Sequence, residues 1–106
     1  MDENTSIKFF ARRNEMKQKM DQLRKRADNL VEEMAKQIKD GGIKDDKYVK
    51  TNAASLFNIN REMIKTREDF VNNLFDLLSV EQVAKFLIFE KRFREEIREL
   101  IFRQDE

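Results

Sequence analysis

The chain of 106 residues contains no proline, cysteine, histidine or tryptophan and only two glycines. Without cysteine there is no disulfide framework, thiol nucleophile or cysteine-bound zinc. Without histidine there is no Ser-His-Asp triad and no imidazole metal ligand. The adjacent Gly41 and Gly42 do not form a GxGxxG or P-loop phosphate-binding loop, and no run approaches the roughly 18 apolar residues of a membrane span. We therefore expect a protein that is not an enzyme, with no cofactor, metal site or membrane span.

Charged residues make up 41% of the chain and nearly balance, with 22 Lys+Arg against 21 Asp+Glu. The positive charges gather in residues 8–26, which carry eight basic and two acidic residues. Such a segment can meet phosphate groups or an anionic membrane. It is also typical of a solvated helix face with i,i+4 pairs such as Glu15–Lys19. Because no aromatic residue is interleaved on the basic side, the solvated face is favoured and nucleic acid is not the expected partner.

Helical spacing of apolar residues predicts an all-α fold with a first helix over residues 5–39. Steps of four and three residues give a heptad pattern, which comprises Met16, Met20, Leu23, Ala27, Leu30 and Met34. At 1.5 Å per residue the helix is about 50 Å long, and it ends at Asp40-Gly41-Gly42 because glycine adopts the left-handed conformation. The methionine thioethers could bind a soft metal such as Cu(I), but their heptad positions favour packing.

A second helix is predicted over residues 46–78, capped by Asp45 or Asp46. It carries two neighbouring apolar stripes with a seven-residue period, one of Leu56, Met63, Phe70 and Leu77 and one of Phe57, Ile64, Val71 and Leu78. This wide apolar face predicts contacts with two neighbours at once. Asn60 and Arg67 lie on the same seam. The favoured interpretation is that Asn60 sets the helix register and that Arg67 forms a pair or extends its charge to solvent; the alternative is a polar spot in a binding groove.

A third helix over residues 80–103 is predicted to follow a sharp change of direction after Leu78. The sequence Ser79-Val80-Glu81-Gln82 has the form of a capping box, in which Ser79 and Gln82 each bind the other's backbone amide. The helix has more apolar residues than one face holds, since Ile88, Phe89, Ile101 and Phe102 are surplus. The sequence therefore predicts an antiparallel hairpin of long helices, a kinked third helix and a homodimer.

Residues 77–86, LLSVEQVAKF, followed by EKRFR at 90–94, resemble the L-T-P-E-Q motif and following helix of the Spy/CpxP family of bacterial periplasmic proteins. The similarity covers about residues 60–102. Ser79 stands where threonine is usual, Val80 replaces the proline, and no upstream copy of the motif is visible. The histidines of metal-sensing relatives are absent, so metal sensing is not expected.

The resemblance implies a thin, cradle-shaped dimer in the periplasm. Family members are ATP-independent chaperones that hold unfolded clients, stress adaptors of a sensor kinase, or regulators of sigma-factor systems. The stretch after Met1 is acidic and polar rather than a secretory signal, so a periplasmic protein would be represented here by a trimmed chain.

The first hypothesis is accordingly a periplasmic holdase chaperone or stress adaptor. Clients would be steered by basic residues and held by apolar ones, and the candidate residues are Arg12, Arg13, Met16, Met20, Leu23 and Arg24. Ser79 and Gln82 are assigned a structural role as a helix cap. The alternatives are a periplasmic sensor that binds one specific regulatory partner, and a cytoplasmic helical hairpin that binds nucleic acid.

Overall fold

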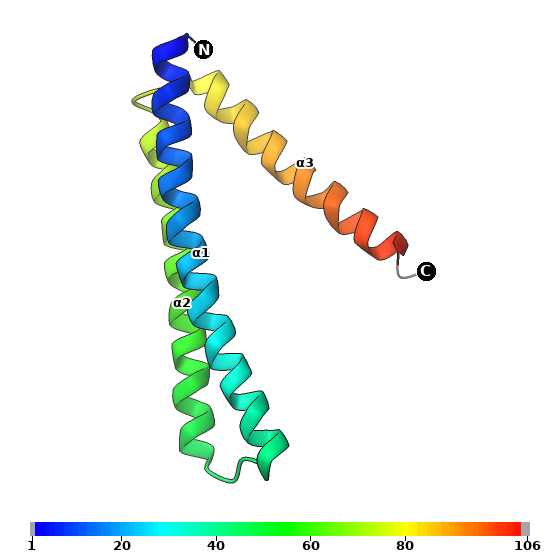
Figure 1. The fold of residues 1–106 in the computed structure, drawn as a ribbon. Coiled ribbons are helices and arrows are strands. Elements are labelled where there is room, and N and C mark those ends of the chain that lie inside the picture. Colours follow the sequence, from blue (N-terminus) through cyan, green and yellow to red (C-terminus); the bar gives the residue numbers. More distant parts are fainter. Residues whose placement is uncertain (1, 105–106) are drawn as a thin grey trace.

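The computed structural model describes residues 2–104, with side chains for residues 2–101. Over this part the chain forms three α-helices and no strand: α1 (Glu3–Asp40), α2 (Asp46–Leu74) and α3 (Val80–Gln104). The predicted all-α class is confirmed. Figure 1 shows α1 and α2 side by side and antiparallel, whereas α3 leaves the open end of this pair at an angle. We call the α1–α2 pair the hairpin.

Short polar residues and glycines set the ends of the hairpin helices. The Asp2 carboxylate accepts a hydrogen bond from the Thr5 backbone N–H at 2.7 Å, and Asp45 accepts one from the Lys47 N–H at 3.0 Å. At the end of α1 the backbone N–H of Gly42 donates to the Gln37 carbonyl at 3.0 Å. Gly42 has a φ of 93°, which glycine adopts at little cost. The connection between the two long helices is therefore only residues 41–45.

The apolar spacing predicted that the second helix ends at residue 78, but α2 ends at Leu74. The N–H groups of Leu77 and Leu78 both donate to the Leu74 carbonyl, at 3.0 and 2.7 Å, and form a turn. The last carbonyls of a helix have no intrahelical partner, and that of Asn73 accepts from Arg12 Nη1 on α1 at 2.7 Å. The turn directs Leu78 into the core, where it is 8% exposed.

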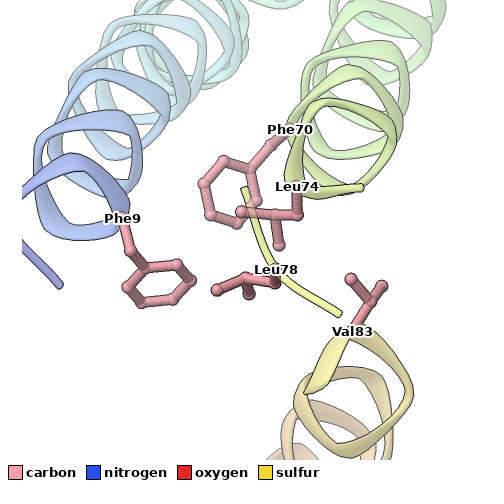
Figure 2. Close-up of a cluster of buried hydrophobic side chains, with 5 residues drawn as sticks. All are labelled: Phe9, Phe70, Leu74, Leu78 and Val83. Carbon is pink, nitrogen blue, oxygen red and sulfur yellow. The ribbon is translucent and has the colours of Figure 1, made fainter. Parts of the chain in front are cut away.

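A cluster of apolar side chains at the open end of the hairpin joins all three helices. Figure 2 shows its buried members, which are Phe9, Phe70, Leu74, Leu78 and Val83. Phe86 packs against this cluster, and the ring centroids of Phe9, Phe70 and Phe86 are 5.8–6.1 Å apart in every pair. Each helix contributes one of these rings, so the cluster fixes where α3 begins.

The molecule is thin and has a large surface for its mass. Its extents are 58 × 35 × 18 Å and its radius of gyration is 18.7 Å, against about 13 Å for a compact domain of this length. The accessible surface is 8911 Å², whereas a compact monomer of this mass exposes about 6,300 Å². Many apolar side chains are consequently left without cover.

Candidate functional site

The apolar residues expected to contact clients mostly pack inside the hairpin, between α1 and α2. Met20 and Leu23 are each 4% exposed, and Met16 is half-buried against the apolar cluster at the open end. The heptad pattern of α1 thus faces α2 of the same chain, which is the element that covers it. A client contact that includes Met20 or Leu23 would require the hairpin to open.

Arg12 also forms hydrogen bonds within the fold. Its Nη1 donates to the Asn73 carbonyl at 2.7 Å and to the Asp76 carboxylate at 2.9 Å. The hydrogen bond from Arg12 lowers the pKa of Asp76 below its ordinary value. Arg12 therefore ties α1 to the turn that precedes α3, and its positive charge is largely matched.

The remaining predicted basic residues are on the surface. Arg24 forms an exposed i,i+3 pair with Asp21 at 3.2 Å, which contributes little to stability. Arg13 is exposed and has no ion pair within the described residues. Arg13 and Arg24 are thus the predicted site residues whose side chains are open to a partner.

Ion pairs between the helices define one side of the hairpin. Arg12 pairs with Asp76 at 2.9 Å, and Arg26 pairs with Glu62 across the hairpin at 3.6 Å. Arg12 and Arg26 are two heptads apart, so they lie on the same flank of α1. At about 100° per residue, Arg13 lies on the other flank.

The side of the hairpin away from these ion pairs is both basic and apolar. It consists of Arg13, Lys17 and Arg24 from α1 and Phe57, Asn60, Ile64 and Arg67 from α2, all exposed. We call this set the basic–apolar face. Phe57 is 63% and Ile64 48% exposed, so these two members of the second stripe are largely uncovered within the described chain, whereas Val71 and Leu78 pack in the apolar cluster at the open end. Because Asn60 is exposed here, it does not set the register of α2 on α1, whereas the exposure of Arg67 agrees with a side chain that extends its charge to solvent.

Analysis of the sequence alone missed the importance of Phe57, Ile64 and Lys17 for this face. The signal was present as the second seven-residue stripe of α2, which was assigned to packing between elements. Which stripe α1 covers depends on how the two helices are rotated about their axes, and that rotation is a property of the folded hairpin.

A second exposed apolar surface runs along α3. Its members are Phe89, Phe93, Ile97 and Leu100, which are 43–66% exposed, and we call them the distal stripe. The rings of Phe89 and Phe93 stack with centroids 5.9 Å apart. The stripe continues from Val83 and Phe86, which pack on the hairpin. The side chain of Phe102, predicted to be surplus, lies outside the described part of the chain.

Ser79 and Gln82 form both hydrogen bonds of the reciprocal cap. The Gln82 N–H donates to Ser79 Oγ at 3.1 Å, and the Ser79 N–H donates to Gln82 Oε1 at 2.9 Å. Val83, in the first turn that this cap organises, is 1% exposed. The cap therefore positions the residue that anchors α3 in the core.

Within the described residues, no group of three or more Asp and Glu side chains is placed to hold a metal ion. Over the same part of the chain, none of the three helices is apolar enough over sufficient length to cross a membrane. The candidate binding features described above are the basic–apolar face and the distal stripe, both of which carry large exposed apolar side chains.

Comparison of the chain with models of protein families, with curated proteins and with solved structures gives no match. The resemblance to Spy/CpxP proteins accordingly depends on the sequence of about residues 60–102, which includes the motif at residues 77–94.

Proposed function

We propose that this protein is a periplasmic, ATP-independent holdase chaperone or stress adaptor that binds unfolded or partner proteins on the basic–apolar face. The observation that carries the proposal is the exposure of Phe57 and Ile64 on a hairpin side that also presents Arg13, Lys17 and Arg67. The periplasmic location depends on the resemblance of residues 77–94 to the Spy/CpxP motif.

The two kinds of side chain on this face have different tasks. Basic residues attract acidic segments over a distance and raise the rate of encounter. Apolar residues then hold the client, at about 1.5–3 kcal/mol for each large side chain that becomes fully buried. Because Phe57 and Ile64 project from a convex helix surface, a client covers them only in part. Binding is therefore weak and reverses without nucleotide hydrolysis.

The proposal includes a homodimer in which two elongated chains form a thin cradle around the client. The large accessible surface of 8911 Å² supports a further partner for the chain. A regulator that binds one specific protein is the alternative, because the same face would also suit a single folded partner with an acidic surface.

The test is light scattering from a chemically unfolded client that is diluted into buffer without nucleotide, with and without the protein. Suppression of aggregation at near-stoichiometric ratios, weaker at high salt, is the expected result. The double variant Phe57→Ser/Ile64→Ser should lose suppression at every salt concentration, whereas Arg13→Glu/Lys17→Glu should lose mainly the salt-sensitive part.

A matched control comes from the same hairpin. Ile7 is 61% exposed, and Lys8 is exposed one turn before Arg12, on the flank of the ion pairs and away from Arg13. The variant Ile7→Ser/Lys8→Glu should therefore suppress aggregation as the parent does. If the parent is folded and helical but never suppresses aggregation, the holdase role is refuted. A single partner captured by pulldown would then favour the regulator, and a steep fall of nucleic-acid affinity with salt would favour the cytoplasmic alternative.

A further inference from the structure

Two uncovered apolar surfaces of the protein begin at the same place. The distal stripe of α3 continues outward from Phe86, and the second stripe of α2 continues from Val71 to the exposed Ile64 and Phe57. Val71 and Phe86 both pack against the buried cluster at the open end of the hairpin. From there the two surfaces diverge, because α3 leaves the hairpin at an angle (Figure 1). They have the arrangement of an interface that is closed at one end only.

α3 begins on the side of the hairpin that carries the basic–apolar face. Phe9 and Val71 pack in the cluster that α3 joins through Val83 (Figure 2). At about 100° per residue, Arg13 lies about 40° from Phe9 around α1, and Arg67 lies about 40° from Val71 around α2. A smaller angle between α3 and the hairpin would therefore bring α3 over the basic–apolar face.

The aromatic rings at the open end determine which residues would meet. The ring centroid of Phe86 lies 5.8 Å from that of Phe9 and 5.8 Å from that of Phe70. Figure 1 shows that α3 runs from the open end in the same general direction as α1, and α2 runs in the opposite direction. Since each helix advances about 1.5 Å per residue, counting from these three rings gives the register of a closed arrangement.

In that register the two apolar surfaces match along their length. Seven residues beyond the ring on α3, Phe93 comes level with Ile64 of α2 to within one residue. After seven more residues, Leu100 comes level with Phe57. All four side chains are 48–63% exposed in the open arrangement. Closure would therefore cover two apolar surfaces that have the same seven-residue period.

The same register brings together three charged side chains that have no ion pair within the described residues. Glu90 is half-buried and follows the buried Val83 by seven residues, so it lies on the inner side of α3. It comes level with Arg13 of α1 and, to within one residue, with Arg67 of α2. None of these three forms an ion pair in the described part of the open chain. Closure would place one carboxylate between two guanidinium groups.

The outer part of α3 lacks support in the open arrangement. Residues 87–104 extend away from the hairpin (Figure 1), and an isolated helix of this length is marginal in water. Closure would stabilise it by removing apolar surface from water. The link to the hairpin is the short segment 75–79, and a few residues of this kind can serve as a hinge. α3 can therefore turn while Val83 and Phe86 stay in the cluster.

We propose that α3 is a lid that closes onto the basic–apolar face with Glu90 between Arg13 and Arg67, and that it excludes clients while it is closed. The inference rests on the proposed function and identifies how its binding face is regulated. A client that covers Phe57 and Ile64 must wait for the open arrangement. Its apparent affinity is therefore reduced in proportion to the fraction of chains that are open.

The closed contact is tested by a disulfide in this cysteine-free chain. Asn60 and Ile97 come level, to within one residue, only when α3 is closed. The variant Asn60→Cys/Ile97→Cys should therefore form a disulfide within one chain in oxidised glutathione, because bridging requires close approach of the two side chains. Faster migration of the monomer on a non-reducing gel measures it. The trapped protein should not suppress client aggregation, and reduction of the same sample should restore suppression.

Asn60→Cys/Glu95→Cys is the matched control. Glu95 pairs with Lys91 at 4.0 Å, and two residues along the helix place Glu95 about 160° from Ile97 around α3. The control pair should form no disulfide within the chain, and oxidised glutathione should not change its suppression of aggregation. Circular dichroism of both reduced variants should show the helix content of the parent.

A charge reversal tests the lid without cysteine. Glu90→Lys would oppose Arg13 and Arg67 with a like charge and keep α3 open. Its affinity for a labelled unfolded client, measured by fluorescence anisotropy, should therefore rise about fivefold or more above that of the parent. Glu95→Lys changes the net charge by the same amount on the outer side of α3 and should bind the client as the parent does.

The inference is overturned if no disulfide forms within the Asn60→Cys/Ile97→Cys chain, or if the trapped chain suppresses aggregation as well as its reduced form. Disulfides between chains alone would also refute it, because α3 of another copy would then cover the face. Equal client affinities of Glu90→Lys and Glu95→Lys would refute the contact at Glu90. If the disulfide forms but the parent never suppresses aggregation, the closed contact stands and the proposed function fails. A parent that suppresses aggregation, with no disulfide in the variant, gives the reverse conclusion.

Discussion

Replacing Ser79 with alanine tests whether the reciprocal cap holds α3 in place. The substitution removes the acceptor of the Gln82 N–H, now bonded at 3.1 Å, and leaves the backbone otherwise unchanged. Loss of a serine cap typically costs about 1 kcal/mol. For a domain of this size, that free energy lowers the melting temperature by about 4–8 °C.

The consequence extends beyond the cap because Val83 follows directly in the first turn of α3. Val83 is 1% exposed and packs in the cluster with Leu74 and Leu78. Fraying of this turn would loosen the anchor of α3 while the rest of the hairpin stays paired. Client binding on the basic–apolar face at low temperature should therefore persist.

The assay is urea unfolding followed by circular dichroism, with Ser79→Thr as the rescue variant. Threonine keeps the acceptor oxygen, so this variant should stay within about 0.5 kcal/mol of the parent. The reasoning is refuted if Ser79→Ala has the same midpoint as the parent, or if Ser79→Thr is destabilised as much as Ser79→Ala.

Three further predictions concern single side chains. Phe9 is 9% exposed in the aromatic cluster, so Phe9→Ala should lower the free energy of unfolding by about 3 kcal/mol. The neighbouring Phe10 is 51% exposed, so Phe10→Ala provides the control. Equal losses of stability in the two variants would contradict the prediction. The Tyr48 hydroxyl is buried without a hydrogen-bond partner among the described residues, so Tyr48→Phe should raise the stability in urea by about 1 kcal/mol; a loss of stability would show that the hydroxyl is satisfied. The hydrogen bond from Arg12 holds the pKa of Asp76 below its ordinary value of 3.8. The stability that the ionised Asp76 contributes is therefore complete at pH values above the unfolded-state pKa and is lost as the pH falls through the lower folded-state pKa. Asp76→Asn should therefore make stability less dependent on pH in this acid range, and an unchanged acid titration of stability would count against the role of Arg12.

Features set by neighbouring residues could be predicted from the sequence. The cap at Asp45, the glycine end of α1 and the Ser79–Gln82 pair involve residues at most five positions apart, and their chemistry is visible in the order of the residues. The end of α2 depends instead on Arg12, which reaches Asn73 from 61 positions away. No local pattern records that contact, so the helical spacing extended the predicted helix to residue 78.

In the candidate site, too, local features could be predicted from the sequence and features that depend on distant contacts could not. The heptad pattern of Met20 and Leu23 correctly marks a contact surface, but only the folded hairpin shows that α2 covers it. The direction of α3 likewise depends on Phe9, Phe70 and Phe86, which are distant in the sequence and meet at one end of the hairpin. The spacing therefore indicates which residues pack but leaves open which apolar surface stays uncovered.

The short connection at residues 41–45 has a kinetic consequence. Contacts between α1 and α2 can form in order outward from this loop, so each step closes only a small additional segment of chain and the search is short. The rate at which the two helices pair should therefore depend little on the length of the loop. Doubling a flexible loop costs only about 0.6 kcal/mol, so this tip of the molecule is a suitable place to insert a reporter peptide without slowing the pairing.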